Sequence, residues 1–473
     1  MAASRRLPPA DGGDRCAVRA AVATALRHAS PPGAHLAVAL SGGRDSIALL
    51  DAAANVAATS GDTLVAFHVH HGLSSAADAW MAFCADACAR RDIAFAARNV
   101  EVRNAGDGVE ATARERRYEA LAAMAREHRV DAILLAHHAD DQAETLLLQL
   151  LRGAGPRGLA AMPVVARARG TRFVRPFLSL PRAAIDAYVT SHALAYVDDD
   201  SNAHTSLRRN ALRARVIPAL RTIAPGYPAT LVRAARHQSD AIELLDDLAR
   251  LDAHGAGHDS LDLAALRALA APRARNLLRW FLRERGLRAP SAARLDAMLQ
   301  QLLGAPPDAR VAVEHDGAVI GIHRARVVVH TPAVTFDARP WRGEPEITLP
   351  HGVLALLPAE GEGVARQYLH GRPVTIRMGG TGERLRLAVR GGRRNVMDLL
   401  REAGVPPWQR LAMPRLYCGD TLAAVAGAGI DASFAAGDGE AGLRLEWRAC
   451  AGTHEPAPGQ PTKKQGCGSD ERS

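Results

Sequence analysis

Hydrophobic positions between Ala34 and Val197 alternate between short continuous runs and longer stretches with helical spacing. A strand buried in a parallel sheet is a short apolar run, whereas an amphipathic helix repeats its apolar positions every three to four residues. The pattern predicts an α/β fold with a doubly wound parallel sheet, which binds its ligands at the carboxyl ends of the strands. The predicted strands are His35–Leu40, Thr63–His70, Ile93–Val100 and Asp131–Ala136, and the predicted helices are Asp45–Ala58, Ala76–Arg91, Glu110–Arg129 and Asp140–Leu151.

The pattern changes at Pro218, and helical spacing in a Leu- and Ala-rich stretch then continues to about Gly304. Short apolar runs follow, and strands mixed with a helix at Val396–Ala403 come after them. The patterns divide the chain into a flexible N-terminus (residues 1–30), the α/β domain (31–218), a linker (219–235), a small helical domain with terminal strands (236–335), a C-terminal α+β domain (336–450) and a disordered tail (451–473).

The charge balance favours a polyanionic partner. The chain has 59 Lys and Arg against 50 Asp and Glu, a net charge of +9, and such an excess suits the neutralisation of nucleic-acid phosphates. The lysines are Lys463 and Lys464, so arginine provides the positive charge of the rest of the chain. Mechanisms that need a phosphate-loop lysine or a Schiff-base lysine are therefore excluded.

The cysteines and the apolar runs give no sign of secretion or of a membrane. The six cysteines are scattered without a C-x-x-C pair, so we expect reduced thiols and no zinc site. No apolar run approaches the length of a membrane helix, and the N-terminus lacks the apolar region of a signal peptide. We expect a cytoplasmic protein without membrane association.

The strongest chemical signal is the segment Ser41–Ser46 (Ser-Gly-Gly-Arg-Asp-Ser), which lies between an apolar run and a helical stretch. A strand, a Gly-Gly turn and a helix start bring backbone N–H groups and the helix dipole together, and this arrangement binds an anion such as pyrophosphate. The motif lacks the Walker pattern and resembles the PP-loop of ATP pyrophosphatases. A serine-capped glycine turn without function is the alternative. The predicted ATP-binding residues are Ser41, Gly42, Gly43, Arg44, Asp45 and Ser46, with Asp45 as a magnesium ligand.

A second group of polar residues follows the last predicted strand of the sheet. On a helix, His137, Asp140 or Asp141, and Glu144 share one face, and such a cluster can bind magnesium or transfer protons. A helix start enriched in acids would explain the aspartates, but neither the paired histidines nor Glu144.

A third pattern places Glu110, Arg114 and Arg117 on one helical face, directly before Tyr118. The arginines could neutralise a phosphate or a departing AMP. An exposed, ion-paired helix is the alternative interpretation.

Together these motifs resemble, in order, those of the tRNA(Ile)-lysidine synthases, a family of bacterial PP-loop ligases, over most of the chain. Beyond the segments above, the resemblance rests on a short motif at the end of the second predicted strand and on further motifs in the later part of the α/β domain and in the C-terminal domain. They are His68–Leu73, Leu151–Pro156, Asp199–Asn202, Arg208–Arg213, Gly391–Leu400 and Val405–Arg410.

The resemblance implies a reaction in two steps that uses ATP and Mg²⁺. The C2 carbonyl oxygen of the wobble cytidine, in isoleucine tRNA with a CAU anticodon, attacks the α-phosphate of ATP and releases pyrophosphate. An amine of free lysine then displaces AMP at C2 and forms lysidine. Residues 31–218 would be the adenylation domain and residues 336–450 a tRNA-binding domain.

The resemblance also implies roles for particular residues. His70 belongs to the loop on the nucleotide side, and Asp141 is a second candidate magnesium ligand. A splayed RNA base needs an aromatic platform, for which Tyr118 and Phe173 are the candidates. The catalytic candidates are Asp45, Arg114, His137, Asp140 and Asp141, and the candidates for lysine or tRNA contacts are Glu110, Glu144, Arg117, Arg209, Asn210, Arg213, Arg393 and Arg394.

Two other functions remain as alternatives. A PP-loop enzyme of the 2-thiocytidine synthetase type should carry paired cysteines for an iron–sulfur cluster, which this sequence lacks. A tRNA-binding protein that retains the fold without catalysis would have no reason to keep the motifs intact. The sequence leaves the oligomeric state open, with a homodimer as one option.

Overall fold

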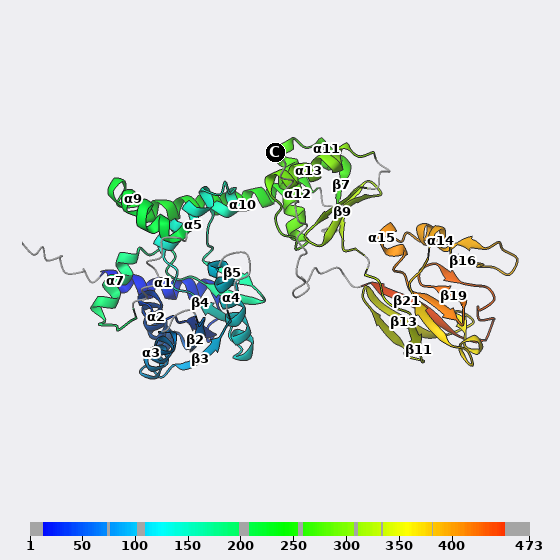
Figure 1. Ribbon diagram of the computed structural model, residues 1–473, viewed down its shortest axis with the longest axis horizontal. Coiled ribbons are helices and arrows are strands. Elements are labelled where there is room, and N and C mark those ends of the chain that lie inside the picture. Colours follow the sequence, from blue (N-terminus) through cyan, green and yellow to red (C-terminus); the bar gives the residue numbers. More distant parts are fainter. Residues whose placement is uncertain are drawn as a thin grey trace, which may run out of the picture. The chain divides into compact units, whose positions relative to one another are not determined.

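The computed structural model of the protein describes residues 13–72, 76–101, 109–197, 208–253, 259–306, 311–332, 334–380 and 382–449. The chain forms two compact units, residues 1–244 and 245–473, which are described separately (Figure 1). None of the helices in the described part is long and apolar enough to cross a membrane.

The first unit is built on a six-stranded sheet in the order β3-β2-β1-β4-β6-β5, in which β5 is antiparallel to β6 and the other pairs are parallel. The strands are β1 (His35–Ala39), β2 (Thr63–His70), β3 (Ala94–Asn99), β4 (Ala132–Leu134), β5 (Val165–Ala168) and β6 (Thr171–Val174). The helices are α1 (Gly13–Ala29), α2 (Arg44–Ser60), α3 (Ala77–Ala89), α4 (Val109–Glu127), α5 (Ala139–Leu150), α6 (Pro156–Leu159), α7 (Arg182–Ser191), α8 (Arg208–Ala211), a π-helical segment (Leu212–Val216), α9 (Ile217–Ile223) and α10 (Tyr227–Asp252).

Helices cover both faces of this sheet. Successive residues of a strand point to opposite faces, so the apolar residues of one strand pack into two separate cores. Leu36 and Val38 of β1 pack into a core with α1, α2, α3 and α7, whereas Ala37 packs with α4 on the other face. A further small core joins α5, the π-helical segment, α9 and α10. The predicted doubly wound α/β fold is confirmed.

Two predicted boundaries of this unit are wrong. Residues 13–29, expected to be part of a flexible N-terminus, form α1, whose Val18 and Val22 lie one turn apart and are fully buried in the core. The predicted linker at 219–235 lies within α9 and the start of α10, because Ile217 and Tyr227 bury their side chains against α5. Proline and glycine near residue 225 therefore mark a turn between two helices.

The second unit begins with the end of α10 and has helices packed with a four-stranded antiparallel sheet in the order β7-β10-β9-β8. This region matches the predicted helical domain with terminal strands, and β7 is a strand that the sequence pattern did not indicate. The elements are β7 (Ser260–Asp262), α11 (Leu263–Ala268), α12 (Ala271–Glu284), α13 (Ala292–Gly304), β8 (Ala312–His315), β9 (Ala318–His323) and β10 (Arg326–His330).

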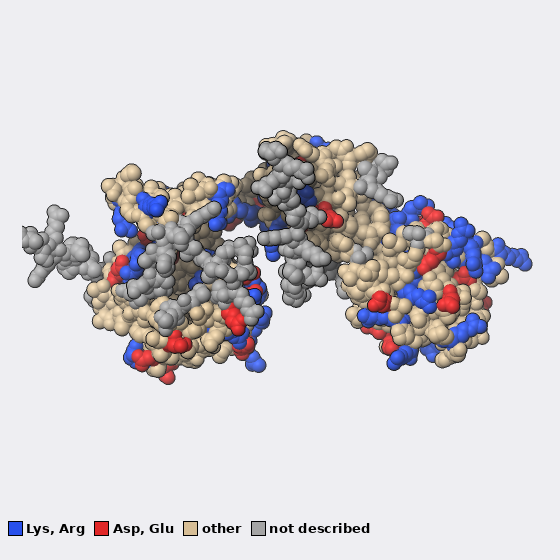
Figure 2. Space-filling view, viewed as in Figure 1, with Lys and Arg blue, Asp and Glu red and all other residues tan. Residues whose placement is uncertain are grey.

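The C-terminal part of this unit has a five-stranded antiparallel sheet, β11-β15-β18-β19-β20, and a four-stranded one, β12-β13-β21-β14, around one core, with α14 packed against it. This is the predicted α+β domain. Arginines are exposed around β16 and β17, where Figure 2 shows basic side chains gathered on the surface. The elements are β11 (Arg339–Trp341), β12 (Glu346–Leu349), β13 (Gly352–Glu360), β14 (Val364–Ala365), a 3₁₀ helix (Arg366–Leu369), β15 (Val374–Arg377), β16 (Arg384–Leu385), β17 (Arg394–Asn395), α14 (Val396–Glu402), α15 (Pro407–Arg410), β18 (Arg415–Cys418), β19 (Thr421–Val425), β20 (Gly429–Ile430) and β21 (Ala441–Ala449).

Arg415 is the largest fully buried side chain of the described residues, and its ion pair should stabilise the C-terminal domain. Its Nε donates to Glu383 at 2.6 Å and its Nη1 donates to the carbonyl oxygen of Met413 at 2.6 Å. Gly379 makes room for the guanidinium, because a Cβ at this position would lie 1.5 Å from Cζ of Arg415.

Replacing Arg415 by alanine is expected to destabilise this unit by about 3–5 kcal/mol, since Glu383 would keep a charge without its partner. Urea unfolding followed by circular dichroism measures the change. Arg448→Ala is the control, because Arg448 pairs with Glu346 at 2.6 Å on the surface, where an ion pair contributes only about 0–1 kcal/mol. Equal losses for the two variants would show that the buried pair does not stabilise the fold.

Candidate active site

The segment from Ser41 to Ser46, called the phosphate loop below, comprises the turn after β1 and the first residues of α2. Its own hydroxyl groups hold it in place. The Oγ of Ser46 donates to the carbonyl of Gly43 at 2.8 Å and lies 3.1 Å from the Oγ of Ser41. Gly42 has φ of +88°, and a Cβ at this position would meet the sulfur of Cys84 at 3.2 Å, so a side chain would be strained there. No side chain caps the start of α2, which leaves its first N–H groups available to an anion.

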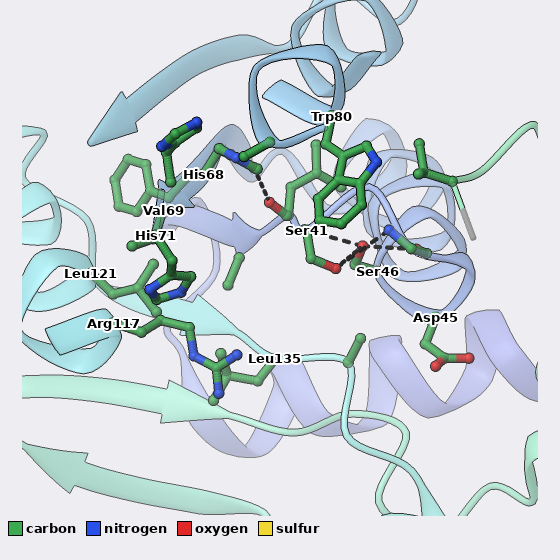
Figure 3. A pocket seen from close by; sticks show the side chains of 18 of the residues that line it. Ser41, Asp45, Ser46, His68, Val69, His71, Trp80, Arg117, Leu121 and Leu135 are labelled. Atoms are coloured by element: carbon green, nitrogen blue, oxygen red, sulfur yellow. Dashed lines mark hydrogen bonds between the residues drawn. The ribbon is translucent and has the colours of Figure 1, made fainter. Parts of the chain in front are cut away.

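This loop borders a cavity of about 590 Å³ at the carboxyl ends of β1, β2 and β4. Figure 3 shows Ser41, Ser46 and Asp45 toward one side of the cavity and His71, Arg117 and Leu135 toward the other. The walls are largely apolar, as expected for a nucleotide pocket. They are formed by Ala39, Leu40, Phe67, Val69, Ala77, Trp80, Leu121, Leu135, Ala136 and Val197.

His138 lies at the centre of an acidic cluster next to this cavity. Its ring nitrogens are 3.7 Å from Asp45, 3.5 Å from Asp141 and 3.8 Å from Asp140. Burial opposes protonation of His138, but the surrounding carboxylates outweigh it and raise the pKa of the imidazole. Burial likewise opposes ionisation of Asp45, but His138, Arg44 and Arg182 together hold the pKa of this carboxyl below its usual value. Asp45 and His138 therefore each favour the charged form of the other.

Sequence reasoning chose His137 and missed His138, because it extended the helical spacing back to His137. The helix α5 begins only at Ala139, and the backbone N–H of His138 donates to Asp141 at 3.1 Å. His137 precedes this turn and lines the cavity instead. The acid enrichment at the helix start was the signal that could have located the N-cap.

Each carboxylate oxygen of Asp140 accepts a hydrogen bond from another helix. It accepts a hydrogen bond from the backbone N–H of Arg182 at 3.0 Å, at the start of α7, and one from the hydroxyl of Tyr227 at 3.3 Å, at the start of α10. These contacts tie three helices together around the cluster. Asp140 thus supports the fold around the cluster, and its catalytic role stays a prediction.

A second charged cluster continues from Asp141. Glu144 is only 5% exposed, and it accepts hydrogen bonds from Arg213 at 2.5 Å and from Arg209 at 3.2 Å. Arg213 also donates to Asp141 at 3.3 Å. The polar side chains thus form a continuous series from the phosphate loop, through His138 and Asp141, to Glu144 and the two arginines. Arg213 lies on the π-helical segment, a distortion that is frequent at functional sites.

Of the remaining site predictions in the first unit, His70 and Arg117 line the cavity, and His70 also pairs with Asp78 at 3.1 Å. Arg44 instead pairs with Asp186 on α7 at 2.8 Å and does not line the cavity. Arg114 is exposed and lies over the ring of Tyr118.

Of the two candidates for an aromatic platform, Phe173 is fully buried, and the half-buried Tyr118 packs edge-on against it outside the cavity lining. Asn210 lies on α8 beside Arg209. Arg393 and Arg394 are exposed on the second unit, where Arg394 pairs with Glu402. The side chains of Glu110 and Arg208 lie outside the described part, as do Leu73 and residues 198–207.

Two neutral histidines lie in the cavity and should make stability depend on pH. Burial, with a contribution from Arg117, lowers the pKa of His71 to about 4; burial also lowers the pKa of His137 to about 3. An unfolded histidine has a pKa near 6.5, so below about pH 6.5 the unfolded chain binds protons that the folded chain does not. Stability is therefore expected to fall as the pH is lowered from about 6.5 toward 4.

His71→Gln is expected to make this decline shallower, as measured by urea unfolding at pH 7 and pH 5. The exposed His28→Gln serves as the control. If the two variants and the parent chain lose stability in parallel over this window, the buried histidines are not responsible.

Comparison with known proteins gives three matches to family models. Residues 18–220 match the PP-loop domain, residues 261–328 the TilS substrate binding domain, and residues 374–447 the TilS substrate C-terminal domain. The matches cover the sheet with its cavity, the helical region and the C-terminal domain in that order.

Curated relatives match over nearly the whole chain, among them three bacterial proteins that are each named tRNA(Ile)-lysidine synthase. The relative from Ralstonia nicotianae is 42% identical over 422 residues, which cover 85% of this chain and 90% of the relative. The relative from Nitrosomonas europaea is 38% identical over 436 residues, covering 89% and 93%. The relative from Burkholderia pseudomallei is 38% identical over 486 residues, covering 93% and 99%.

Proposed function

The chain belongs to the tRNA(Ile)-lysidine synthase family, and from this premise we propose how its cavity joins lysine to C2 of the wobble cytidine in CAU-anticodon isoleucine tRNA. The reaction consumes ATP and yields lysidine, AMP and pyrophosphate. One observation supports this assignment to the cavity above all others. The continuous polar series joins an anion-binding loop to a buried set of carboxylates and guanidinium groups, so the sites for both steps adjoin.

In the first step the phosphates of ATP bind at the loop from Ser41 to Ser46 and at the N-terminus of α2. The C2 carbonyl oxygen of cytidine forms a bond to the α-phosphorus, and the bond from the α-phosphorus to the bridging oxygen breaks. Pyrophosphate leaves with the negative charge that builds up on it. N–H donors that are already in place stabilise this charge without reorganisation.

Asp45 fits the role of a magnesium ligand. Its Oδ1 is buried without a hydrogen-bond partner among the described residues, and its neighbours keep the carboxyl ionised. The described residues contain no group of three or more His, Cys, Asp or Glu side chains that could hold a metal alone. Mg²⁺ needs only one or two carboxylates when phosphates and water complete its shell, and it would then neutralise phosphate charge. We assign the ion to Asp45, with Asp141 nearby.

In the second step a lysine amine forms a bond to C2 and AMP departs with the oxygen of the base. One amine of lysine must reach C2, which leaves one ammonium and one carboxylate for the protein to bind. Asp141 and Glu144 suit the ammonium, whereas Arg209 and Arg213 suit the carboxylate. The pKa of His137 at about 3 makes it a poor proton acceptor for an alkylammonium, so we assign it hydrogen bonding within the cavity.

The tRNA is proposed to contact arginines in both units. Arg117, inside the cavity, is suited to the anticodon nucleotides or AMP, and the exposed Arg114 lies on the same helix. The exposed Arg393 and Arg394 of the second unit are suited to backbone phosphates.

The assignment is tested by incubating the protein with ATP, Mg²⁺, radiolabelled lysine and a CAU-anticodon isoleucine tRNA transcript. Label should enter the RNA, and a transcript with uridine at the wobble position should remain unlabelled. Pyrophosphate release without lysine transfer would indicate another PP-loop enzyme. Absence of both would favour a tRNA-binding protein without catalysis.

A further inference from the structure

Trp80 is an aromatic residue of the cavity for which the predicted site had no role. It lies in the first turns of α3, one turn before Phe83 and Cys84, the side chains nearest to Gly42 of the phosphate loop. Residues three and four positions apart share one face of a helix, so Trp80 projects toward the loop. The indole is half-buried and lines the cavity together with Ser41 and Ser46.

Trp80 differs from Phe67, Tyr118 and Phe173 because it both lines the cavity and keeps an accessible surface. Phe67 also lines the cavity but is 0% exposed. Phe173 is fully buried, and the half-buried Tyr118 packs edge-on against it and does not line the cavity. Of these four aromatic residues, Trp80 is therefore the one whose ring face a ligand in the cavity could contact. Figure 3 shows its indole on the side of Ser41 and Ser46, away from His71 and Arg117.

The proposed reaction brings two bases into this cavity, the wobble cytosine and the adenine of ATP. Their positions relative to the phosphate loop differ. The C2 oxygen of cytosine has to reach the α-phosphorus, so the accepted base must lie at the loop end. The adenine of ATP is separated from the α-phosphate by its ribose. It would lie at the end of the cavity away from the loop, which is lined by the apolar side chains of Val69, Leu121 and Leu135. The indole of Trp80, which lies next to the loop, is thus placed to contact the cytosine.

We propose that the indole of Trp80 is the platform on which the wobble cytosine stacks, so that its C2 oxygen faces the α-phosphate. This inference rests on the proposed function and adds a positioning residue to it. Bases splayed from RNA loops are commonly held by aromatic stacking. Because every base has a π-face, stacking sets the position and affinity of the base, and other groups must distinguish cytosine from uracil.

Trp80→Ala is expected to lower kcat/KM for tRNA in tRNA-dependent pyrophosphate release by on the order of tenfold or more, the range for loss of one base stack. The KM for ATP should change less than about twofold. Trp80→Phe should restore most of the loss, because it keeps an aromatic face. Met81→Ala is the matched control, since Met81 is also half-buried on α3 but does not line the cavity. Thermal unfolding of each variant reports whether its fold is kept.

A binding measurement separates stacking on cytosine from stacking on adenine. Fluorescence of the parent chain minus that of Trp80→Phe isolates the signal of this indole. A CAU anticodon stem-loop RNA without ATP should quench it, and a non-hydrolysable ATP analogue alone should not.

Quenching by the ATP analogue alone, with a raised KM for ATP in Trp80→Ala, would overturn the proposal in favour of adenine. Equal kinetics for Trp80→Ala and Met81→Ala would overturn it as well. Failure of the parent chain to transfer lysine would instead count against the proposed function. The fluorescence titration would still decide whether the indole stacks on the RNA base, because binding needs no catalysis.

Discussion

Replacement of Asp45 by asparagine is expected to slow pyrophosphate release, and with it lysine transfer, by about 100- to 1,000-fold. Asparagine has nearly the same shape but no charge, so the phosphates of ATP would lose the carboxylate that we assign to Mg²⁺. The neighbouring His138 would also lose the partner that lies 3.7 Å away. The rate is measured as pyrophosphate released in the presence of the tRNA transcript.

The control for this variant is Asp86→Asn, which removes a carboxylate that is exposed on α3 and pairs with Arg90. It should behave like the parent chain. If Asp45→Asn keeps activity within a few-fold of the parent at saturating Mg²⁺, Asp45 does not hold the ion, and Asp141 becomes the first candidate.

Replacement of Glu144 by glutamine is expected to raise the KM for lysine by at least about tenfold and to leave tRNA-dependent pyrophosphate release nearly unchanged. Glu144 is buried and accepts hydrogen bonds from two guanidinium groups. Removing the charge of a buried carboxylate weakens its interaction with a bound cation far more than removing a surface charge does. Glu144 is assigned to the ammonium of lysine and not to ATP. The variant should therefore separate the two steps, with adenylated tRNA accumulating at low lysine concentration.

Glu119→Gln is a suitable control for this variant, because Glu119 pairs with Arg116 on the surface of α4 at 2.9 Å. Equal loss of both steps in Glu144→Gln would contradict a role in lysine binding. Such a result would mean that Glu144 chiefly holds Arg209 and Arg213 in place for the fold of this region.

Sequence patterns were sufficient for strands β1 to β4 and for the phosphate loop, because both depend on neighbouring residues, but they did not indicate β5 and β6. The apolar run of β1, the Gly-Gly turn and the start of α2 follow one another directly, and Gly42 adopts the positive φ that glycine permits. The order of domains likewise follows from local changes in composition. The family matches confirm this fold.

Other parts of the site depend on contacts that no local pattern encodes. Arg213 meets Glu144 across 69 positions of sequence, and Tyr227 meets Asp140 across 87. Extending the helical spacing of α5 back to His137 led to the choice of His137 over His138, although α5 begins at Ala139 and His137 precedes it in non-helical backbone. Burial of α1 was missed because its apolar face needs the rest of the core as a partner.

The π-helical segment Leu212–Val216 makes the number of residues in this part of the chain as important as their identity. Each residue of an α-helix turns the chain by about 100°, and a π-helical turn accommodates one residue more than an α-helical turn. Deleting one residue after Arg213 would let the segment relax to an α-helix and rotate either Arg213 or Ile217 away from its partner. Evolution of this segment should therefore tolerate many substitutions at its exposed positions but strongly disfavour single-residue insertions and deletions.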